Sequence, residues 1–411
     1  MMKRIAAIAF IFVCTSIAWA VLGSTIFYRT YSTDSQLRNR VASSWGAPQE
    51  QAPPTAGYMA VNSKRAISTE NGKEVVRSEE HRSFVGFPLE KSRVNVGLHL
   101  DYRRKGLLWY STYQVRFSGT YEFLNTSEQA QDVIFTFHFP AEEAIYDDLA
   151  FSVNGAATPI SNEKTDIVAH RVVQPHESVI LNVGYRSQGL ENWKYNFGSE
   201  VSQVKDFQLR VTTDFNGFDF PENTLSPTEE HQVPTGWELV WNYGNLVSGY
   251  KIGLEMPQKL QPGPLAGRIS YFAPVSLLFF FLVLFVLTTV RSIELHPMNY
   301  FFLACAFFSF HLLMAYLVDR ISIHEAFVIC SAVSVFLVVS YLRLVVGMRF
   351  AAMEAGLAQF VYLVSFSYAF FFAGFTGLAI TIGAVLSLFI VMQMTGRIRW
   401  ADKFAGRTAI G

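Results

Sequence analysis

Hydrophobic and polar positions divide the chain into three regions with different patterns. Residues 5–27 contain no charged side chain, residues 269–395 are almost continuously apolar, and the region between them is ordinarily polar. About 20 apolar helical residues are enough to cross the hydrocarbon core of a bilayer, which is about 30 Å thick. The pattern therefore predicts an integral membrane protein with a polar region inserted between its membrane segments.

The first apolar run follows a short basic head and predicts an N-terminal transmembrane anchor over residues 1–27. A cleaved signal peptide is the alternative, because Ala18-Trp19-Ala20 fits a small-x-small cleavage site. The apolar run continues for seven residues beyond that site, which favours the retained anchor. In either case the segment that follows is exported.

The second half of the chain predicts five more spanning helices, which form a bundle over residues 269–395 and precede a short tail over residues 396–411. These spans are Ile269–Val290, Met298–Val318, Ala326–Val346, Gly356–Ala373 and Gly377–Met394.

The distribution of basic residues predicts the orientation, because cytoplasmic segments carry an excess of Lys and Arg. Placing both termini in the cytoplasm leaves few basic residues in the external loops, chiefly Arg268 and Arg320. This topology puts residues 28–268 outside the cytoplasm. The basic residues on the inner side are then Lys3, Arg4, Arg291, Arg343, Arg349, Arg397, Arg399, Lys403 and Arg407.

The external region alternates between apolar and polar residues from about Leu98 onward, as half-buried strands do. The clearest runs are residues 113–123 and 133–139, and Asn154-Gly155 is a strong two-residue hairpin signal. We therefore predict an α+β membrane protein, with an all-β, sandwich-like extracytoplasmic domain over residues 98–268 and six spanning helices. Residues 28–97 show little hydrophobic period and predict an irregular stalk or lead-in.

Composition limits the classes of function. The formal net charge is zero, so no overall field favours nucleic acid. The three cysteines, Cys14, Cys305 and Cys330, lie inside apolar runs, so the external domain relies on an ordinary core without disulfides. We expect no cofactor and no catalytic role for these thiols.

Catalytic and metal-binding motifs are weak. Residues 161–164 and 202–205 match S-x-x-K, but they lie in strand and turn territory and lack a K-T-G partner. His176-Glu177 and His324-Glu325 begin like H-E-x-x-H without the second histidine. A pair of histidines, His170 and His176, is poor evidence for a metal site. The acidic cluster Glu142, Glu143, Asp147 and Asp148 fits a solvated loop better than a calcium site.

The membrane region offers a small set of candidate functional residues. His311 lies well inside a predicted span, where ionisable residues are costly and often functional. A histidine bonded to a neighbouring helix is the simpler interpretation. Asp319, Arg320, His324 and Glu325 share one external loop, where they could pair with one another or contact the β domain.

One link carries a resemblance to a known family. Residues 294–300, ELHPMNY, end in Leu-His-Pro-Met before a Phe/Leu-rich span, and this resembles the CreD-like inner-membrane proteins of bacteria. Residues 395–400, TGRIRW, are similar to that family's closing T-R-x-I-D-W, and residues 103–107, RRKGL, to its R-R-G-[LI]. Arg399 departs from the usual aspartate, and His311 stands where an aromatic residue is expected. His296-Pro297 itself is best explained as a structural start of the third span.

The resemblance implies an envelope protein of the inner membrane, associated with colicin tolerance and with a response under two-component control. It assigns no catalytic residue. We therefore expect a non-enzymatic protein of cell-envelope integrity, whose external domain binds an envelope protein or cell-wall component. The alternatives are a small-molecule transporter or channel formed by the last five spans, and a membrane-bound enzyme acting at the junction of domain and bilayer.

Overall fold

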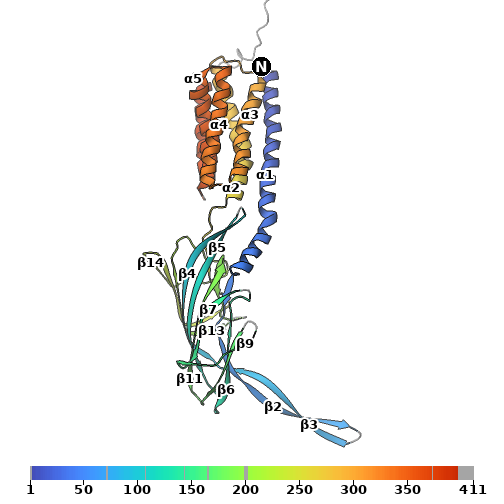
Figure 1. Cartoon of the computed structure of the whole chain (residues 1–411), viewed down its shortest axis with the longest axis vertical. Helices are drawn as coiled ribbons and strands as arrows, with labels where there is room; N and C mark the ends of the chain where they lie inside the picture. Colours follow the sequence, from blue (N-terminus) through green and yellow to red (C-terminus); the bar gives the residue numbers. More distant parts are fainter. Residues whose placement is uncertain are drawn as a thin grey trace, which may run out of the picture. The chain divides into compact units, whose positions relative to one another are not determined.

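The computed structural model describes residues 2–70, 73–106, 108–142, 144–163, 166–198, 202–372 and 374–396. The chain divides into two compact units, each of which is described by itself (Figure 1). The membrane unit comprises residues 1–35, 106–108 and 260–411, and the β unit comprises residues 36–105 and 109–259.

Helix α1, Met2–Ser44, begins the chain and contains the predicted anchor. Its 43 residues correspond to a length of about 65 Å, roughly twice the hydrocarbon thickness of a bilayer. The helix continues beyond residue 27 because no glycine or proline interrupts the chain between Gly23 and Gly46. It ends before Gly46, where an added Cβ would lie 2.0 Å from the backbone oxygen of Gln188.

The membrane unit contains the other long helices. They are α2 (Pro262–Val290), α3 (Pro297–Leu317), α4 (Ile323–Val345), the composite segment Met348–Phe371 and α8 (Thr376–Thr395). Together with α1 they make six helices, among the described residues, that are long and apolar enough to cross a membrane, which confirms the prediction of six spans. The predicted tail over residues 396–411 lies outside the described residues, apart from Gly396, and so does Ala373 at the end of the predicted fifth span.

The fifth span is not a regular helix. It consists of α5 (Met348–Phe350), a π-helical turn (Ala351–Ala355), α6 (Gly356–Gln359), a second π-helical turn (Phe360–Ser365), α7 (Phe366–Tyr368) and a 3-10 turn (Ala369–Phe371). Between the π-helical turns, the buried Gln359 donates from Nε2 to Ser334 Oγ over 2.9 Å, and Ser334 donates to the Ala306 carbonyl over 2.7 Å. This chain of hydrogen bonds links α6, α4 and α3, because a buried amide in an apolar bundle needs polar partners.

Small and aromatic residues fit α1 against the bundle. An added Cβ at Gly267 of α2 would lie 2.8 Å from Phe27 Cε2, so the absence of a side chain there admits the Phe27 ring. Trp19 is fully buried, with its ring 5.2 Å from the centroid of Phe308 and 6.0 Å from that of Phe307. Close approach and aromatic packing therefore hold α1 to α2 and α3.

Within the described residues, the β unit contains three sheets. The eight-stranded sheet has the order β14 (Glu229–Val233), β15 (Gly236–Ser248), β13 (Ser202–Thr213), β4 (Leu89–Lys105), β5 (Leu108–Leu124), β11 (Ser178–Leu190), β7 (Tyr146–Val153) and β8 (Ala156–Ala157). The five-stranded sheet has the order β3 (Lys73–Gly86), β2 (Thr55–Glu70), β6 (Gln131–His138), β10 (Asp166–Val173) and β9 (Ser161–Glu163). The three-stranded sheet has the order β1 (Gln49–Gln51), β12 (Asn192–Tyr195) and β16 (Ile252–Glu255).

One hydrophobic core joins the sheets. Phe117 and Phe123 of β5 are buried with Phe135 and Phe137 of β6, so both larger sheets contribute to the same cluster. The inward positions of β5 are those that the alternating sequence predicted. The predicted Asn154-Gly155 turn joins β7 to β8, with both residues at positive φ as a type I′ turn requires. The sandwich-like α+β fold class is therefore confirmed.

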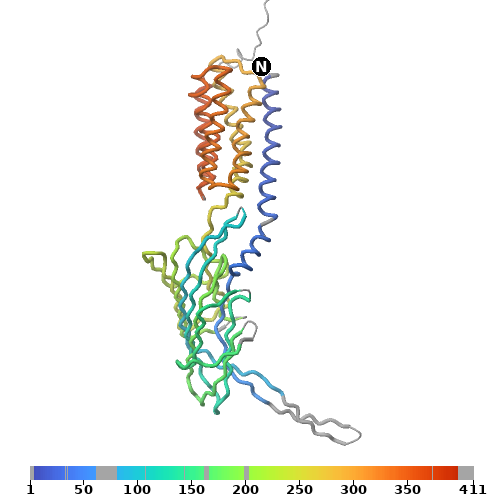
Figure 2. The backbone as a smooth tube through the Cα atoms, viewed as in Figure 1, coloured from blue at the N-terminus to red at the C-terminus, as the bar shows by residue number. Residues whose placement is uncertain are grey.

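Residues 28–97 differ from the irregular lead-in that the sequence predicted. They form the end of α1, strands β1 to β3 and the first half of β4 (Figure 2). Strands β2 and β3 pair as one long hairpin, from Gly57 opposite Gly86 to Glu70 opposite Lys73. Near its base the apolar side chains of Val61 and Phe84 are 55% and 51% exposed. Because these apolar side chains face solvent, their positions carry no clear alternation between apolar and polar residues.

Polar side chains are also buried in the β unit. Gln51 accepts a hydrogen bond from the Tyr185 hydroxyl at 2.8 Å, and Gln49 donates to Ser187 Oγ at 2.9 Å. The Tyr113 hydroxyl donates to the Asn192 carbonyl at 2.7 Å. These bonds fasten β1 and β12 to β11 and β5, since buried polar groups are costly unless paired.

The ring of Tyr113 lies over Gly189, its direct partner on the neighbouring strand. A Cβ at Gly189 would lie 2.2 Å from Tyr113 Cζ, so Gly189→Val should displace the ring and lower the stability of the β unit by about 1–3 kcal/mol. Thermal unfolding of the full-length chain in detergent, followed by tryptophan fluorescence, measures the effect. Gly244→Val is the matched control, because an added Cβ there meets no atom within 4 Å. Equal melting temperatures for the two variants would contradict the prediction.

Alkali should also weaken the β unit. Burial raises the pKa of Tyr146 to about 12 and raises the pKa of Tyr185 well above its usual value. Since an unfolded tyrosine ionises near pH 10, these groups stabilise the fold fully below pH ~10, and the stabilisation is lost as pH rises toward 12. The melting temperature should therefore fall between pH 10 and 12, and it should fall less in Tyr146→Phe. An identical fall in both proteins would contradict the assignment for Tyr146.

Candidate functional site

His311 lies fully buried in α3, away from the ends of the helix. Its Nδ1 is 3.2 Å from the carbonyl oxygen of Phe307 in the same helix, and Nε2 has no hydrogen-bond partner among the described residues. The ring packs edge-on against Trp19 and Phe310, with centroid distances of 5.7 and 4.9 Å. His311 thus sits among aromatic rings, and its bonded nitrogen contacts its own helix rather than a neighbouring one.

The four residues predicted in one external loop make contacts at the ends of different helices. Asp319 pairs with Arg29 of α1 at 3.3 Å, and the same guanidinium donates to the Ala315 carbonyl at 3.0 Å. Glu325 forms a capping box with Ser322 at the start of α4. The ring of His324 lies 5.1 Å from that of Phe371, and the Arg320 backbone N–H donates to the Leu317 carbonyl. These contacts hold α1, α3, α4 and the fifth span, and none of them joins one of the four residues to another.

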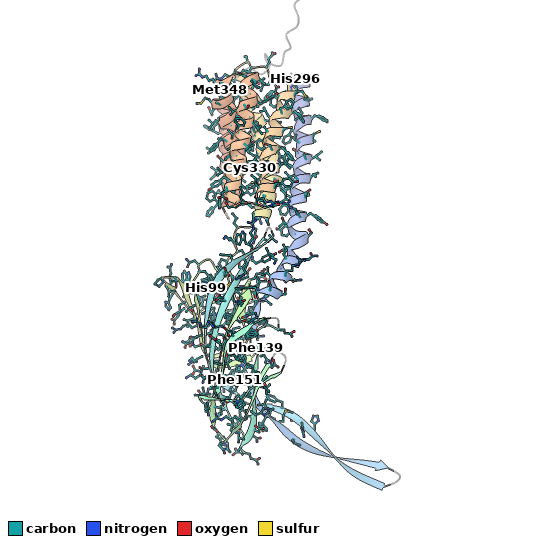
Figure 3. The ribbon with its side chains drawn as sticks, in the orientation of Figure 1. His99, Phe139, Phe151, His296, Cys330 and Met348 are labelled. Carbon is teal, nitrogen blue, oxygen red and sulfur yellow. The ribbon has the colours of Figure 1, made fainter. Side chains whose placement is uncertain are left out.

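His296 and Pro297 start α3. His296 occupies the N-cap position and accepts a hydrogen bond at Nδ1 from the Met298 backbone N–H over 3.2 Å, and Pro297 is the first helical residue. This geometry matches the structural role expected for the pair. Figure 3 labels His296 at an end of its helix.

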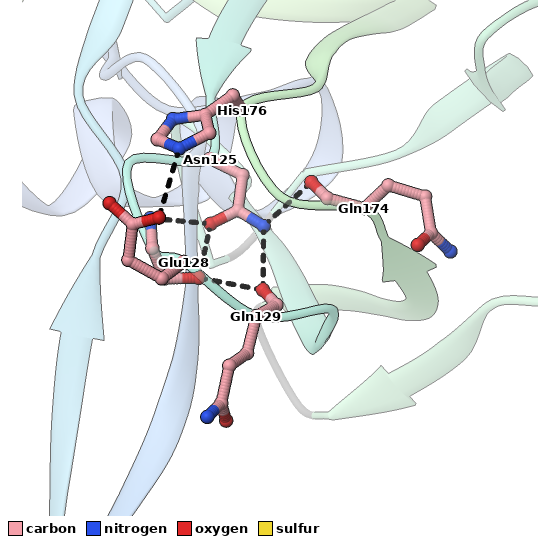
Figure 4. A network of polar contacts seen from close by, with 6 residues as sticks. Asn125, Glu128, Gln129, Gln174 and His176 are labelled. Carbon is pink, nitrogen blue, oxygen red and sulfur yellow. Dashed lines mark hydrogen bonds and ion pairs between the residues drawn. The ribbon is translucent and has the colours of Figure 1, made fainter.

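The histidines considered as metal ligands each face a carboxylate instead. His176 Nε2 is 3.4 Å from Glu128, beside a turn held by Asn125, which donates to Gln174 (Figure 4). His170 is 3.6 Å from Asp132. Within the described part of the chain, no three His, Cys, Asp or Glu side chains are grouped closely enough to hold a metal ion.

A groove of about 1000 Å³ is hollowed into the outward face of the eight-stranded sheet. Strands β4, β5, β11 and β13 form its floor, and the start of β7 and the β14–β15 turn contribute to its rim. Figure 3 labels His99 in this part of the β unit. The polar and charged floor residues are Asn95, His99, Gln114, Arg116, Ser118, Arg186, Gln188, Arg210 and Thr212.

The registers of the strands place one row of these residues across the sheet. Thr212 lies opposite Gly97, and Arg116 lies opposite Arg186, which in turn lies opposite Asp147. An added Cβ at Gly97 would be 3.9 Å from Arg116 Cβ and 3.6 Å from Thr212 Oγ1. Gly97 therefore places no side chain in the middle of the row, between Thr212 Oγ1 and Arg116 Cβ.

The two opposed arginines have different surroundings. Arg186 pairs with Asp147 at 3.1 Å and with Asp148 at 2.7 Å. A register shift between β7 and β11 occurs at this point, and Asp148 adopts a positive φ of 51°. Such a bulge redirects side chains, and here both carboxylates reach one guanidinium. Arg116 has no hydrogen bond, ion pair or ring contact with any residue that the structure describes.

Other charges of the groove are paired at its margins. Arg210 is 3.5 Å from Glu238, and His99 forms a close pair with Asp214. Like charges placed directly opposite on a sheet destabilise it, and within the described residues only Arg186 of the central pair is neutralised by the protein. In the alternating run predicted over residues 113–123, Gln114, Arg116 and Ser118 occupy the polar positions. The sequence did not predict the groove, because the groove depends on which strands are neighbours.

In a comparison with known families, residues 242–401 match the family described as Inner membrane protein CreD. The stretch over residues 103–107, whose similarity to the same family was drawn from the sequence, lies outside the matched residues. No curated protein matches the chain significantly.

Solved structures show distant likenesses, each at 9% identity. A candidate nutrient-binding protein of Legionella pneumophila has a TM-score of 0.33, with 57% of this chain and 76% of that chain covered. An M1 zinc metallopeptidase of Deinococcus radiodurans gives 0.26, with 41% and 42% covered. A single-residue mutant of an M1 zinc metallopeptidase from the same organism, bound to a peptide substrate, gives 0.27, with 74% and 90% covered. With TM-scores below 0.5, these likenesses carry no argument about this chain.

The family match includes the Leu-His-Pro-Met link that begins α3 and most of the membrane unit's helices. Over residues 242–401, the chain therefore matches the CreD family of inner membrane proteins, as the sequence motifs of this region predicted.

Proposed function

We propose that this chain is a non-enzymatic inner-membrane protein of cell-envelope integrity, whose β unit faces the periplasm and binds an envelope component in the groove. The observation that carries the proposal is the groove itself. A cavity of about 1000 Å³ with a polar floor lies on a strand-built unit that a membrane protein presents to solvent. Ligand sites in proteins typically occupy about 300–1,000 Å³ and use a few fixed polar groups for specificity.

The periplasmic placement is supported by the chain's order and its basic residues. The β unit lies in sequence between α1 and α2, so both of its ends continue into helices that can cross a membrane. Arg291, Arg343 and Arg349 fall at the helix ends that would face the cytoplasm if the β unit is outside. Arg29, at the opposite side, is paired with Asp319 rather than left as a free charge.

A binding role without catalysis is supported by the ion pairs that carboxylates form in and beside the groove. Asp147 in the groove pairs with Arg186, and Glu238 at its margin pairs with Arg210. A general base or a nucleophile needs a group poised to exchange a proton with its substrate. Carboxylates engaged in ion pairs and lying at solvent are suited to orienting a ligand instead.

The orientation predicts labelling of a single new cysteine. The chain's own cysteines, Cys14, Cys305 and Cys330, all lie in the membrane unit. In a Cys-less variant, Thr120→Cys on the exposed face of β5 should react with a membrane-impermeant maleimide in cells whose outer membrane is permeabilised. Arg349→Cys, on the opposite side, should react only after the inner membrane is opened. The reverse pattern would contradict the periplasmic placement.

Filling the groove should impair function without unfolding the protein. Gly97→Phe projects a ring into the open space beside Arg116, and Gly97→Ala adds a methyl group at ordinary contact distances. In a strain that lacks the chromosomal gene, the Phe variant should be as sensitive to envelope stress as the empty-vector strain. The Ala variant should complement fully.

Thr120→Phe provides the control for bulk on the same strand and face, because Thr120 is exposed and lies outside the groove. It should complement like the original chain. Melting temperatures of the three purified variants should agree within a few degrees, which shows that they fold. Full complementation by a folded Gly97→Phe variant would contradict a role for the groove.

A further inference from the structure

Arg116 carries a positive charge at the centre of the groove that no described residue neutralises. It faces Arg186 directly across two paired strands, which costs electrostatic repulsion. Arg186 is neutralised by two aspartates, whereas Arg116 has no partner among the described residues. Its neighbour on the other side is Gly97, so no side chain covers it from that position of β4. Arg116, Arg186, Asp147 and Asp148 together carry no net charge, but both carboxylates are held by Arg186. The Arg116 guanidinium therefore lacks a hydrogen-bonding partner of its own among the described residues, and an anionic group with two acceptor oxygens would supply one.

The lining of the groove includes amides and hydroxyls beside its apolar and charged residues. Asn95, Gln114 and Gln188 present side-chain amides, while Ser118 and Thr212 present hydroxyls. Each amide both donates and accepts hydrogen bonds, and each hydroxyl can do either. Such a floor matches a ligand rich in hydroxyl groups, which also donate and accept.

The position of the groove argues against an extended peptide. Peptides that bind sheets usually add a strand at an exposed edge and use its backbone groups. Strands β13, β4, β5 and β11 are inner strands with a neighbour on each side, so the ladders occupy their backbone groups. The groove therefore offers side chains rather than free backbone groups.

We infer that the groove binds an extended glycan that carries a carboxylate, with Arg116 as the residue that holds the acidic group. This inference rests on the proposed function and names its ligand class. A guanidinium matches a planar carboxylate through two parallel hydrogen bonds. Because the two arginines and the two aspartates already sum to zero charge, a monoanion adds less negative charge to this cluster than a phosphate dianion would. The amides and hydroxyls of β4, β5, β11 and β13 contact the sugar hydroxyls on either side.

Direct binding tests the inference on the full-length chain, purified in a detergent without a sugar headgroup. The probe is a hexamer of galacturonic acid, and its neutral counterpart is the same hexamer with methyl-esterified carboxyls. The acidic hexamer should bind, its affinity should fall with added salt, and the neutral hexamer should bind at least tenfold more weakly. Arg116→Gln should weaken binding of the acidic hexamer by about tenfold, equivalent to about 1.4 kcal/mol.

Matched variants separate the role of Arg116 from total charge and from folding. Arg82→Gln removes one exposed arginine from β3, outside the groove, and should leave binding unchanged. Arg116→Lys keeps the charge but loses the planar fork, so its affinity should fall between those of the original chain and Arg116→Gln. Equal binding of the acidic and esterified hexamers, or unchanged binding by a folded Arg116→Gln variant, would overturn the inference.

A poly-glutamate peptide of similar length distinguishes an acidic glycan from acidity alone. If the peptide bound as tightly as the acidic hexamer, the glycan assignment would be overturned.

Failure of this inference is separable from failure of the proposed function. If Gly97→Phe abolishes envelope resistance while no acidic glycan binds, the inference is overturned and the groove works on another ligand. If the acidic hexamer binds through Arg116 while Gly97→Phe complements fully, the ligand class stands and the envelope role falls.

Discussion

The antiparallel pairing of β5 with β11 sets both faces of the β unit. Its register runs unbroken from Leu124 opposite Ser178 to Thr112 opposite Leu190. A slip of one residue would exchange the two faces of either strand, because side chains alternate along a strand. The same register therefore buries Phe117 beside Tyr185, with ring centroids 4.9 Å apart, and turns Arg116 and Arg186 outward. Core and groove are two consequences of one strand pair, and neither can change without the other.

The membrane unit follows a different constraint, which is the absence of water around its helices. Backbone groups must be bonded within each segment, and buried side-chain amides must find partners among neighbouring helices. Gln359 meets this demand through Ser334 and the Ala306 carbonyl. The flanking π-helical turns shift the residues of the fifth span around its axis. The Gln359–Ser334–Ala306 chain therefore contributes to helix association.

The spanning helices and the half-buried strands could be predicted because lipid, or a buried core on one side, leaves a regular pattern of apolar residues. Long uncharged runs predicted all six spans, and strict alternation predicted β5, β6 and the turn at Asn154-Gly155. The prediction failed for residues 28–97, since the polar continuation of α1 and the exposed apolar residues of the β2–β3 hairpin give no periodic signal. The sequence also did not predict which strands are neighbours in the sheets. Strand β4 pairs in parallel with β13, more than 100 residues later in the chain, and no local pattern encodes that contact.

The candidate site also combines features that the sequence predicts with features that depend on the folded arrangement of strands. Arg116 was recognisable as an outward residue of a predicted strand, yet nothing in the sequence marks it as different from Arg186 or Arg210. The difference arises at a bulge in β7, where Asp148 takes a positive φ and both aspartates converge on Arg186. A bulge with a strained non-glycine residue costs stability, and proteins retain such features where a side chain must be aimed. Because the bulge brings both aspartates to Arg186, the opposed Arg116 is left without a partner among the described residues.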